Sequence, residues 1–393
     1  MAPNHGPFTK TNHQIPISTR HQPTISTTGV STGTSTRTRD SNIVSASGTD
    51  LSILTQFHAG YFRISLALCS QALLWKTLAE PTTDAHALSG IVRTIPSFAF
   101  ILLWLIALLT LLLLCSLYMI RCFLRFRNVR AELAHHVGMN YLFAPWISFL
   151  LLLQSTPFLR PSSQLYRVLW CAFSVPIIAL DVKIYGHWFT QGKKFLSMVA
   201  NPTSQITVIG NLVGARAAAK MGWRESAVCM FSLGITHYLV LFVTLYQRFL
   251  GSDSLPAMLR PVFFLFIAAP SMASLAWDSI SSSFDISCKM LFFLSLFLFV
   301  SLVTRPALFK RSMRRFSIAW WAYSFPLTVL ALAATAYAQD VKGVMPNVLM
   351  LVLSVLSVVV TIALMVFTAF KTHDILPHDD PFACYSIVRH IST

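Results

Sequence analysis

The chain has 393 residues, of which 55% are apolar and 11% are charged, and its formal net charge is +16. Because soluble domains carry about 25% charged residues, this composition excludes an ordinary soluble protein and predicts a membrane protein with several spans. The basic excess lies in loops between apolar runs, where it indicates topology and contact with anionic lipid; nucleic-acid binding is not expected.

Residues 1–58 are rich in Ser and Thr and poor in large apolar side chains, which predicts a disordered cytoplasmic tail. The absence of an acidic residue before Asp40 is also typical of an organelle transit peptide, so this alternative stays open. Phosphorylation of such a tail would place negative charge near basic loops, which makes a protein kinase an expected partner. The tail has no Arg-x-x-Ser/Thr triplet, so no phosphorylation site is assigned.

Ten apolar runs follow, and a single bilayer crossing needs about 20 residues. They predict an all-α polytopic membrane protein with ten transmembrane helices over residues 59–372 and a short cytoplasmic tail over 373–393. Lys and Arg are denser in the loops on the side of the two termini, which places both termini in the cytoplasm. The predicted spans are residues 62–78, 95–120, 137–159, 168–186, 202–220, 226–247, 261–280, 287–304, 316–339 and 344–370.

Prolines fall in alternate spans, at Pro145, Pro202, Pro270 and Pro326. A proline has no N–H and opens the helical hydrogen-bond ladder, which lipid tolerates only where the freed groups face protein or water. The pattern predicts five helical hairpins whose odd members surround an axis while the even members face lipid. In the ninth span Phe325 precedes Pro326, so a large ring at a kink is the candidate gate of a pore.

Polar residues occur in two neighbouring spans. Thr207, Asn211 and Arg216 lie in the fifth span among small residues, which either line a pore or allow close helix packing. The Arg216 side chain either faces the pore or extends to the outer interface. Asp181 in the fourth span predicts an ion pair with another helix or, alternatively, proton coupling, and His237 has the same two interpretations.

Other chemistry finds little support. The seven cysteines include no Cys-x-x-Cys pair and no zinc-ligand spacing, so no metal site is expected. A nucleotide-binding Gly-x-x-x-x-Gly-Lys-Ser/Thr loop is also missing, so an ATP-driven pump is not expected. The sequence thus predicts neither an enzyme nor a cofactor.

Motifs across residues 60–371 resemble those of the plant slow-type (S-type) anion channels, which are related to bacterial TehA and the tellurite-resistance/dicarboxylate transporters. The matching stretches are Ser70-Gln71-Ala72, Phe143-Ala144-Pro145-Trp146, Lys183-Ile184-Tyr185-Gly186, Val199-Ala200-Asn201-Pro202, Gly210-Asn211-Leu212-Val213-Gly214, His237-Tyr238, Phe242 to Arg248, Ala268-Ala269-Pro270-Ser271, and Ala319-Trp320-Trp321 to Pro326.

The resemblance implies a plasma-membrane homotrimer in which every protomer has its own nearly uncharged pore for chloride and nitrate. It implies that Phe325 plugs this pore. Where the family has a second pore aromatic this chain has Leu151, which would loosen the constriction and leave Phe325 as the main barrier. Two alternatives remain: a proton-coupled carrier of organic or tellurite-like anions, and a modulatory subunit of heteromeric channels.

Overall fold

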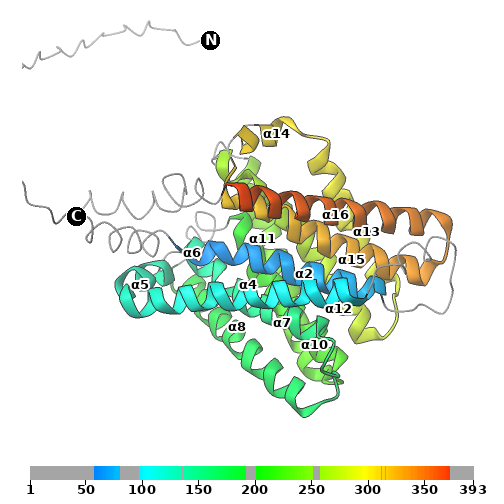
Figure 1. The fold of residues 1–393 in the computed structure, drawn as a ribbon, viewed down its shortest axis with the longest axis horizontal. Helices are drawn as coiled ribbons and strands as arrows, with labels where there is room; N and C mark the ends of the chain where they lie inside the picture. Colours follow the sequence, from blue (N-terminus) through cyan, green and yellow to red (C-terminus); the bar gives the residue numbers. More distant parts are fainter. Residues whose placement is uncertain are drawn as a thin grey trace, which may run out of the picture. The chain divides into compact units, whose positions relative to one another are not determined.

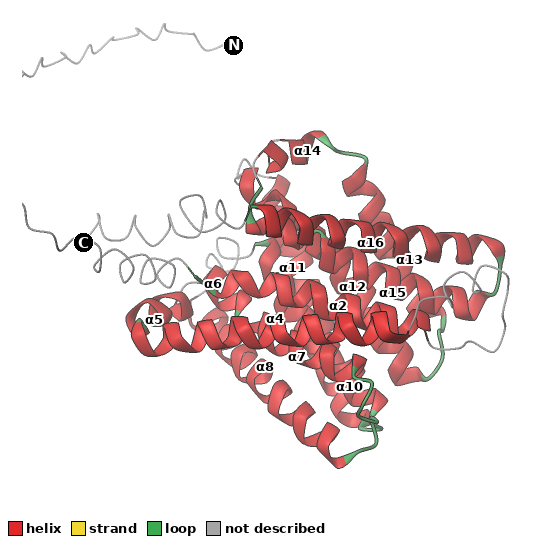
Figure 2. Ribbon diagram, viewed as in Figure 1, coloured by secondary structure: helices red, strands yellow, loops and turns green. Residues whose placement is uncertain are grey.

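The structure is a computed structural model that describes residues 57–79, 97–134, 136–191, 201–250, 257–310, 312–314 and 316–371. The tails expected over residues 1–58 and 373–393 lie outside the described residues, apart from Phe57 and His58. Every regular element in the described ranges is a helix (Figure 2). The predicted all-α class is confirmed.

Ten long helices form in the described part of the chain, one for each predicted span. Eight spans are long and apolar enough to cross a membrane, and those containing α2 and α10 fall outside this group. The number of crossings therefore stays a prediction. The helices are α2 (Phe62–Ala79), α4 (Ser97–Leu124), α7 (Phe143–Ser155), α8 (Gln164–Gln191), α10 (Gln205–Lys220), α11 (Arg224–Leu250), α12 (Leu265–Ser281), α13 (Ile286–Val303), α15 (Ser324–Val341) and α16 (Val344–Phe370).

Consecutive long helices pack as hairpins (Figure 1): α2 with α4, α7 with α8, α10 with α11, α12 with α13 and α15 with α16. Some of the turns are very short. Gly222 joins α10 to α11 with a φ of 85°, a conformation that glycine adopts without steric cost. Asp285 starts α13 by accepting a hydrogen bond from the Cys288 N–H at 3.0 Å. Because each hairpin returns the chain to the same end, the first helices of all five hairpins begin at one end of the bundle.

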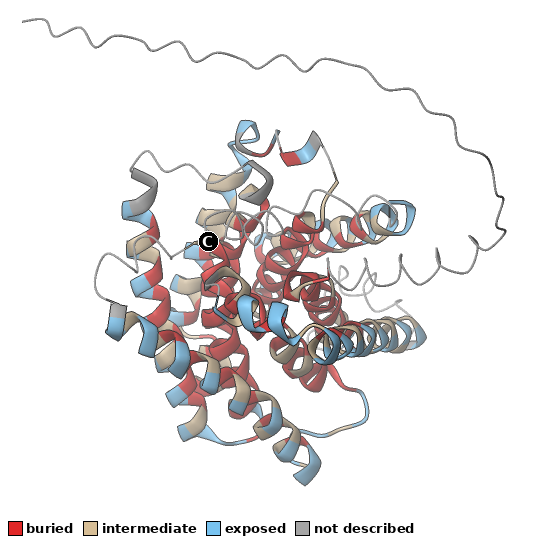
Figure 3. Ribbon diagram, turned by 90° about the vertical axis from the view of Figure 1, so that its left-hand side faces the viewer, coloured by how far each residue is buried: buried red, intermediate tan, exposed pale blue. Residues whose placement is uncertain are grey.

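The first helices of the hairpins form a closed ring. Helix α2 contacts α7, α7 contacts α10, α10 contacts α12, α12 contacts α15, and α15 contacts α2 again. In the apolar stretches containing α7, α12 and α15, 67–94% of the residues are buried, against 17–33% for α4, α8, α11, α13 and α16 (Figure 3). The outer helices expose large apolar side chains, as contact with lipid requires. The predicted arrangement of inner odd and outer even helices is confirmed.

Every ring helix is preceded by a short helical segment. These segments are η1 (Ala59–Tyr61), α6 (His136–Tyr141), η2 (Pro202–Ser204), η3 (Ala257–Phe264) and η5 (Ile318–Ala322). Four of them are tight 3₁₀ turns, which are common where α-helices begin. The internal repeat that the prolines indicated in four hairpins thus extends to the first hairpin, where no proline marks it. Three further short helices are α5 (Phe126–Ala134), α14 (Ala307–Lys310) and η4 (Ser312–Arg314).

Candidate functional site

Phe325 lies in the first turn of α15, directly after the break that separates η5 from α15. Its side chain is 1% exposed. Pro326 is the third residue of α15, where its missing N–H removes no hydrogen bond because the first N–H groups of a helix have no partner within it. The expected kink in the middle of the span is therefore a junction between two helical segments, and Phe325 lies at that junction.

The other three prolines lie either at the start of a helix or inside one. Pro145 is the third residue of α7 and Pro202 is the first residue of η2, so both lie at helix starts. Pro270 lies inside α12, where a proline removes the hydrogen bond to the carbonyl four residues earlier, that of Phe266. Of the four prolines, only Pro270 occupies a position that opens the ladder of its helix.

Leu151 is fully buried in α7, a helix that contacts the ring helices α2 and α10. Among the described residues, no aromatic ring packs against Phe325. Within the described ranges Phe325 is thus a single ring without a stacked partner, and a looser constriction caused by Leu151 stays a prediction.

The polar side chains of Thr207 and Asn211 are turned toward outer helices. The Thr207 hydroxyl lies 3.3 Å from Nδ1 of His237 in α11 and donates to the Ser204 carbonyl at 2.8 Å. The Asn211 amide donates to Oδ2 of Asp181 in α8 at 2.7 Å. These hydrogen bonds tie α10 to α11 and α8, which supports the packing interpretation of both residues over a place inside the ring.

Asp181 and His237 have neutral partners among the described residues. The ion pair expected for Asp181 is not formed there, and its contact is the amide of Asn211. His237 is 1% exposed, and its ring centroid lies 4.8 Å from that of Trp188 and 5.3 Å from that of Tyr185. These contacts favour the structural interpretation of the histidine.

Arg216 is buried near the last turn of α10, at 6% exposure. Its Nη1 lies 3.4 Å from Oε1 of Gln154 in α7, and the Gln154 amide donates to the Val213 carbonyl at 3.2 Å. The carboxylate of Asp278 in α12 interacts electrostatically with the guanidinium. The side chain is therefore held between ring helices.

Residues 56–369 match the model of the SLAC1 family, described as voltage-dependent anion channel. The chain belongs to this family. It is 57% identical over 329 residues to the S-type anion channel SLAH1 of Arabidopsis thaliana, a match that covers 84% of this chain and 85% of the relative. The guard cell S-type anion channel SLAC1 of the same plant is 40% identical over 332 residues, covering 83% of this chain and 58% of the relative.

A more distant match is the tellurite resistance protein TehA homolog of Haemophilus influenzae, 25% identical over 284 residues, with 71% of this chain and 80% of the relative covered. The resemblance found in the sequence motifs is thus confirmed. Family membership makes this chain a helical membrane protein and supports an anion channel function. The plant relatives are named as channels, which fits a protein that is not an enzyme.

A buried hydrogen-bond network in this anion channel family member holds the first turn of α15. The Gln71 amide nitrogen in α2 lies 3.0 Å from the Thr328 hydroxyl, 2.7 Å from the Ser357 hydroxyl and 2.9 Å from the Thr361 hydroxyl. The Ser324 hydroxyl, next to Phe325, lies 2.7 Å from that of Thr361. The network joins α2, α15 and α16 beside the junction that carries Phe325.

Sequence reasoning missed the role of Gln71. The signal was present, since an amide side chain in an otherwise apolar span needs partners. Its partners lie 257 to 290 positions away along the chain, in the last hairpin. Only the closure of the ring shows that they meet.

Proposed function

We propose that this protein is a slow-type anion channel that conducts chloride and nitrate passively through a pathway along the axis of the helix ring, with Phe325 as the gate. The observation that carries the proposal is the position of Phe325: a fully buried ring at the start of a ring helix, where η5 gives way to α15. A change in backbone angles at such a junction moves the side chain without unwinding α15. Membership of the anion channel family supports the proposal.

Three of the ring helices carry few charged residues, which fits a channel that selects anions by how strongly they are hydrated. Helices α7 and α12 contain one charged residue between them, Asp278, and α15 has its single charged residue, Asp340, near its C-terminal end. The five ring helices begin at one end of the bundle, so their dipoles place partial positive charge there. An anion that loses water in such a pathway gains only weak partners, so weakly hydrated nitrate passes more readily than chloride.

The experiment is voltage clamp of oocytes that express Phe325→Ala. A large constitutive anion current is expected, with a reversal potential in mixed solutions that shows nitrate permeating better than chloride. Phe292→Ala is the matched control, because it truncates an equally buried ring on the outer helix α13 and is expected to leave the current unchanged. Silence of both the wild type and Phe325→Ala, with both proteins at the cell surface, contradicts gating by Phe325 in the homomer.

A proton-coupled carrier is a second candidate because Asp181 is a buried carboxylate without a cationic partner in the described ranges. Its Oδ2 accepts from Asn211, and its Oδ1 has no hydrogen-bond partner there. A carrier predicts uptake of organic or tellurite-like anions that follows the pH gradient and is abolished by Asp181→Asn. A channel predicts that the same substitution leaves the reversal potential unchanged.

The proposal also covers assembly and membrane orientation. We propose a homotrimer in the plasma membrane, as the family resemblance implies. Both termini are placed in the cytoplasm because the loops on their side carry the denser basic residues. A modulatory role in heteromers predicts little current alone and altered selectivity when this chain is expressed with a conducting relative. A protein kinase acting on the tails remains part of the proposal, without an assigned site.

A further inference from the structure

Arg63 is a buried cation at the start of the ring helix α2. The residue is 3% exposed, and its Nε donates to the carbonyl of Gly60 at 2.8 Å. The guanidinium carbon lies 4.8 Å from the centre of the Tyr141 ring. Both Nη1 and Nη2 are buried and have no hydrogen-bond partner among the described residues. Four of the five N–H groups of the guanidinium are thus left without an acceptor.

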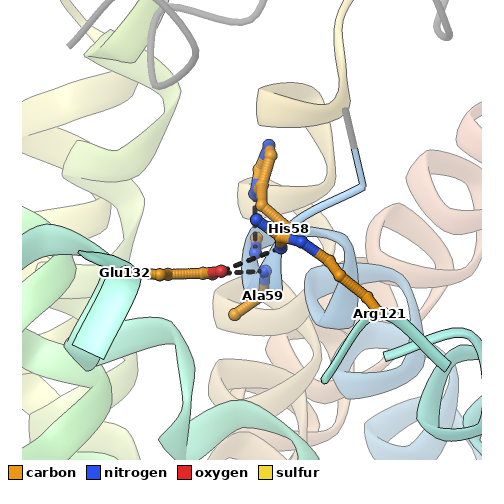
Figure 4. Close-up of polar contacts among 5 residues, drawn as sticks. His58, Ala59, Arg121 and Glu132 are labelled. Atoms are coloured by element: carbon orange, nitrogen blue, oxygen red, sulfur yellow. Dashed lines mark hydrogen bonds and ion pairs between the residues drawn. The ribbon is translucent and has the colours of Figure 1, made fainter. Parts of the chain in front are cut away.

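The carboxylate of Glu132, which contacts the segment before α2, is already used by other groups. Oε2 of Glu132 pairs with Nη1 of Arg121 at 2.8 Å, and Oε1 accepts from the Ala59 N–H at 2.7 Å (Figure 4). Within the described ranges, no carboxylate lies at ion-pair distance from Arg63. The face of the Tyr141 ring attracts the guanidinium but supplies no acceptor for the N–H groups at its edge. The charge of Arg63 is therefore buried without a counter-ion from the described protein.

We propose that Arg63 is the core of a binding site for a small inorganic anion and that nitrate binds there in preference to chloride. A buried cation is stable when an anion pairs with it and accepts its hydrogen bonds. The Nη1 and Nη2 edge offers parallel N–H groups in one plane, which match two oxygens of a planar oxyanion. Chloride provides charge but no such pair of acceptors. The proposal adds a site to the proposed channel and does not require this chain to conduct by itself.

Gly60 shapes the surroundings of this guanidinium. A Cβ atom at residue 60 would lie 3.0 Å from Nη2 of Arg63 and 2.7 Å from Nδ1 of His58. Nδ1 of His58 also accepts from the Gly60 N–H at 2.9 Å. The absence of a side chain at residue 60 thus allows the imidazole and the guanidinium edge to approach the same position.

The location connects the site to the ring. Arg63 is the second residue of α2, and Tyr141 ends α6, the short helix that precedes α7. Two residues further along α2, the Ser65 hydroxyl lies 3.2 Å from that of Ser148 in α7. An anion bound to Arg63 would neutralise the charge at the contact between α2 and the segment leading into α7. Occupancy of the site is therefore expected to stabilise the folded channel.

The test is thermal unfolding of the purified full-length protein in a buffer whose only anion is a large sulfonate such as HEPES. Sodium nitrate and sodium chloride are titrated separately at constant ionic strength. For the wild type, the Tm is expected to rise by about 2 °C or more at tenfold excess over Kd, with nitrate effective at lower concentration. Arg63→Met, which replaces the guanidinium with a shorter, unbranched apolar side chain, is expected to lose this rise and to be at least as stable as the wild type in HEPES alone.

Two further variants decide the outcome. Arg127→Gln removes an exposed arginine from α5 and is expected to keep the full response to nitrate. Arg63→Lys keeps the charge but not the planar fork, so nitrate and chloride should raise its Tm at equal concentrations. This variant tests the site even where Arg63→Met does not fold. A wild type without a response, or an Arg63→Met protein with the wild-type response, overturns the site. If both anions raise the Tm of the wild type at equal concentrations, the claim that the planar guanidinium edge selects nitrate is overturned. Currents of Phe325→Ala are recorded separately, so failure of conduction and failure of this site are distinguishable.

Discussion

Replacing Gln71 with leucine removes the donor at the centre of the network beside Phe325 while nearly keeping the side-chain volume. The amide nitrogen has three hydroxyl groups at 2.7–3.0 Å, but its two N–H groups donate two hydrogen bonds at a time, each of which contributes about 0.5–1.5 kcal/mol net when buried. None of the hydroxyls is left alone, because Thr328 and Thr361 donate to their own helices and Ser357 stays 2.9 Å from Thr328. The expected loss of stability is therefore in the lower half of the sum for two hydrogen bonds, about 1–2 kcal/mol.

The assay is unfolding followed by tryptophan fluorescence of the purified protein, combined with voltage clamp of the same variant. If Gln71→Leu loosens the first turn of α15, which carries Phe325, an increased leak current through the channel is expected. Gln164→Leu is the matched control, because Gln164 is exposed at the start of α8 and is expected to change stability by less than about 0.5 kcal/mol. A Gln71→Leu protein that is as stable as this control refutes the idea that the network holds α15 against α2.

Three other changes test separate parts of the structure. Glu132→Gln leaves Arg121 charged and buried, so a loss of about 3–5 kcal/mol is expected in unfolding measurements, and a loss below about 1 kcal/mol contradicts a buried ion pair. Gly60→Ala places a Cβ 2.5 Å from Cε1 of His58, so it should lower the Tm and weaken the response to nitrate; an unchanged Tm shows that the segment adapts. Asp285→Ala removes the cap of α13 at a cost of about 1 kcal/mol, measurable by the same unfolding assay.

The capping carboxylate also gives a pH dependence. Partial burial raises the pKa of Asp285, but hydrogen bonds from the Cys288 N–H and the Trp277 indole outweigh it and hold this pKa below its ordinary value. A carboxyl group with a lowered pKa in the folded state stabilises the protein above its unfolded pKa, and this contribution is lost as the pH falls through the folded pKa. Below pH 4 the Asp285→Ala variant should therefore approach the wild type in stability. A difference that stays constant from pH 7 to pH 3 would contradict this role of the ionised carboxylate.

Hydropathy and proline spacing predicted the helices and their inner or outer positions, because both properties depend on short stretches of sequence. The span predicted at residues 344–370 coincides with α16, and that at 202–220 coincides with η2 together with α10. The start of α15 could not be predicted in this way. An apolar run is continuous across residues 316–339 and does not show where a 3₁₀ turn ends and an α-helix begins, so Pro326 suggested a kink in the middle of the span.

The orientation of polar side chains was also beyond the sequence. Thr207 and Asn211 lie four residues apart on one helix, and composition does not set the rotation of that helix about its axis. Their partners, His237 and Asp181, each lie 30 positions away on different outer helices. The lack of a counter-ion for Arg63 among the described residues was hidden for a related reason, since an arginine at a span boundary ordinarily extends toward water.

The contact between α2 and α15 has a consequence for how this protein is made. The ring closes between the first and the last hairpin, and Gln71 must wait for Thr328, 257 positions later, to leave the ribosome. Until then, one flank of α2, including a polar amide, faces lipid or a chaperone of the insertion machinery. A message truncated before the last hairpin would therefore yield an incomplete ring in which the Gln71 amide lacks its partners in α15 and α16.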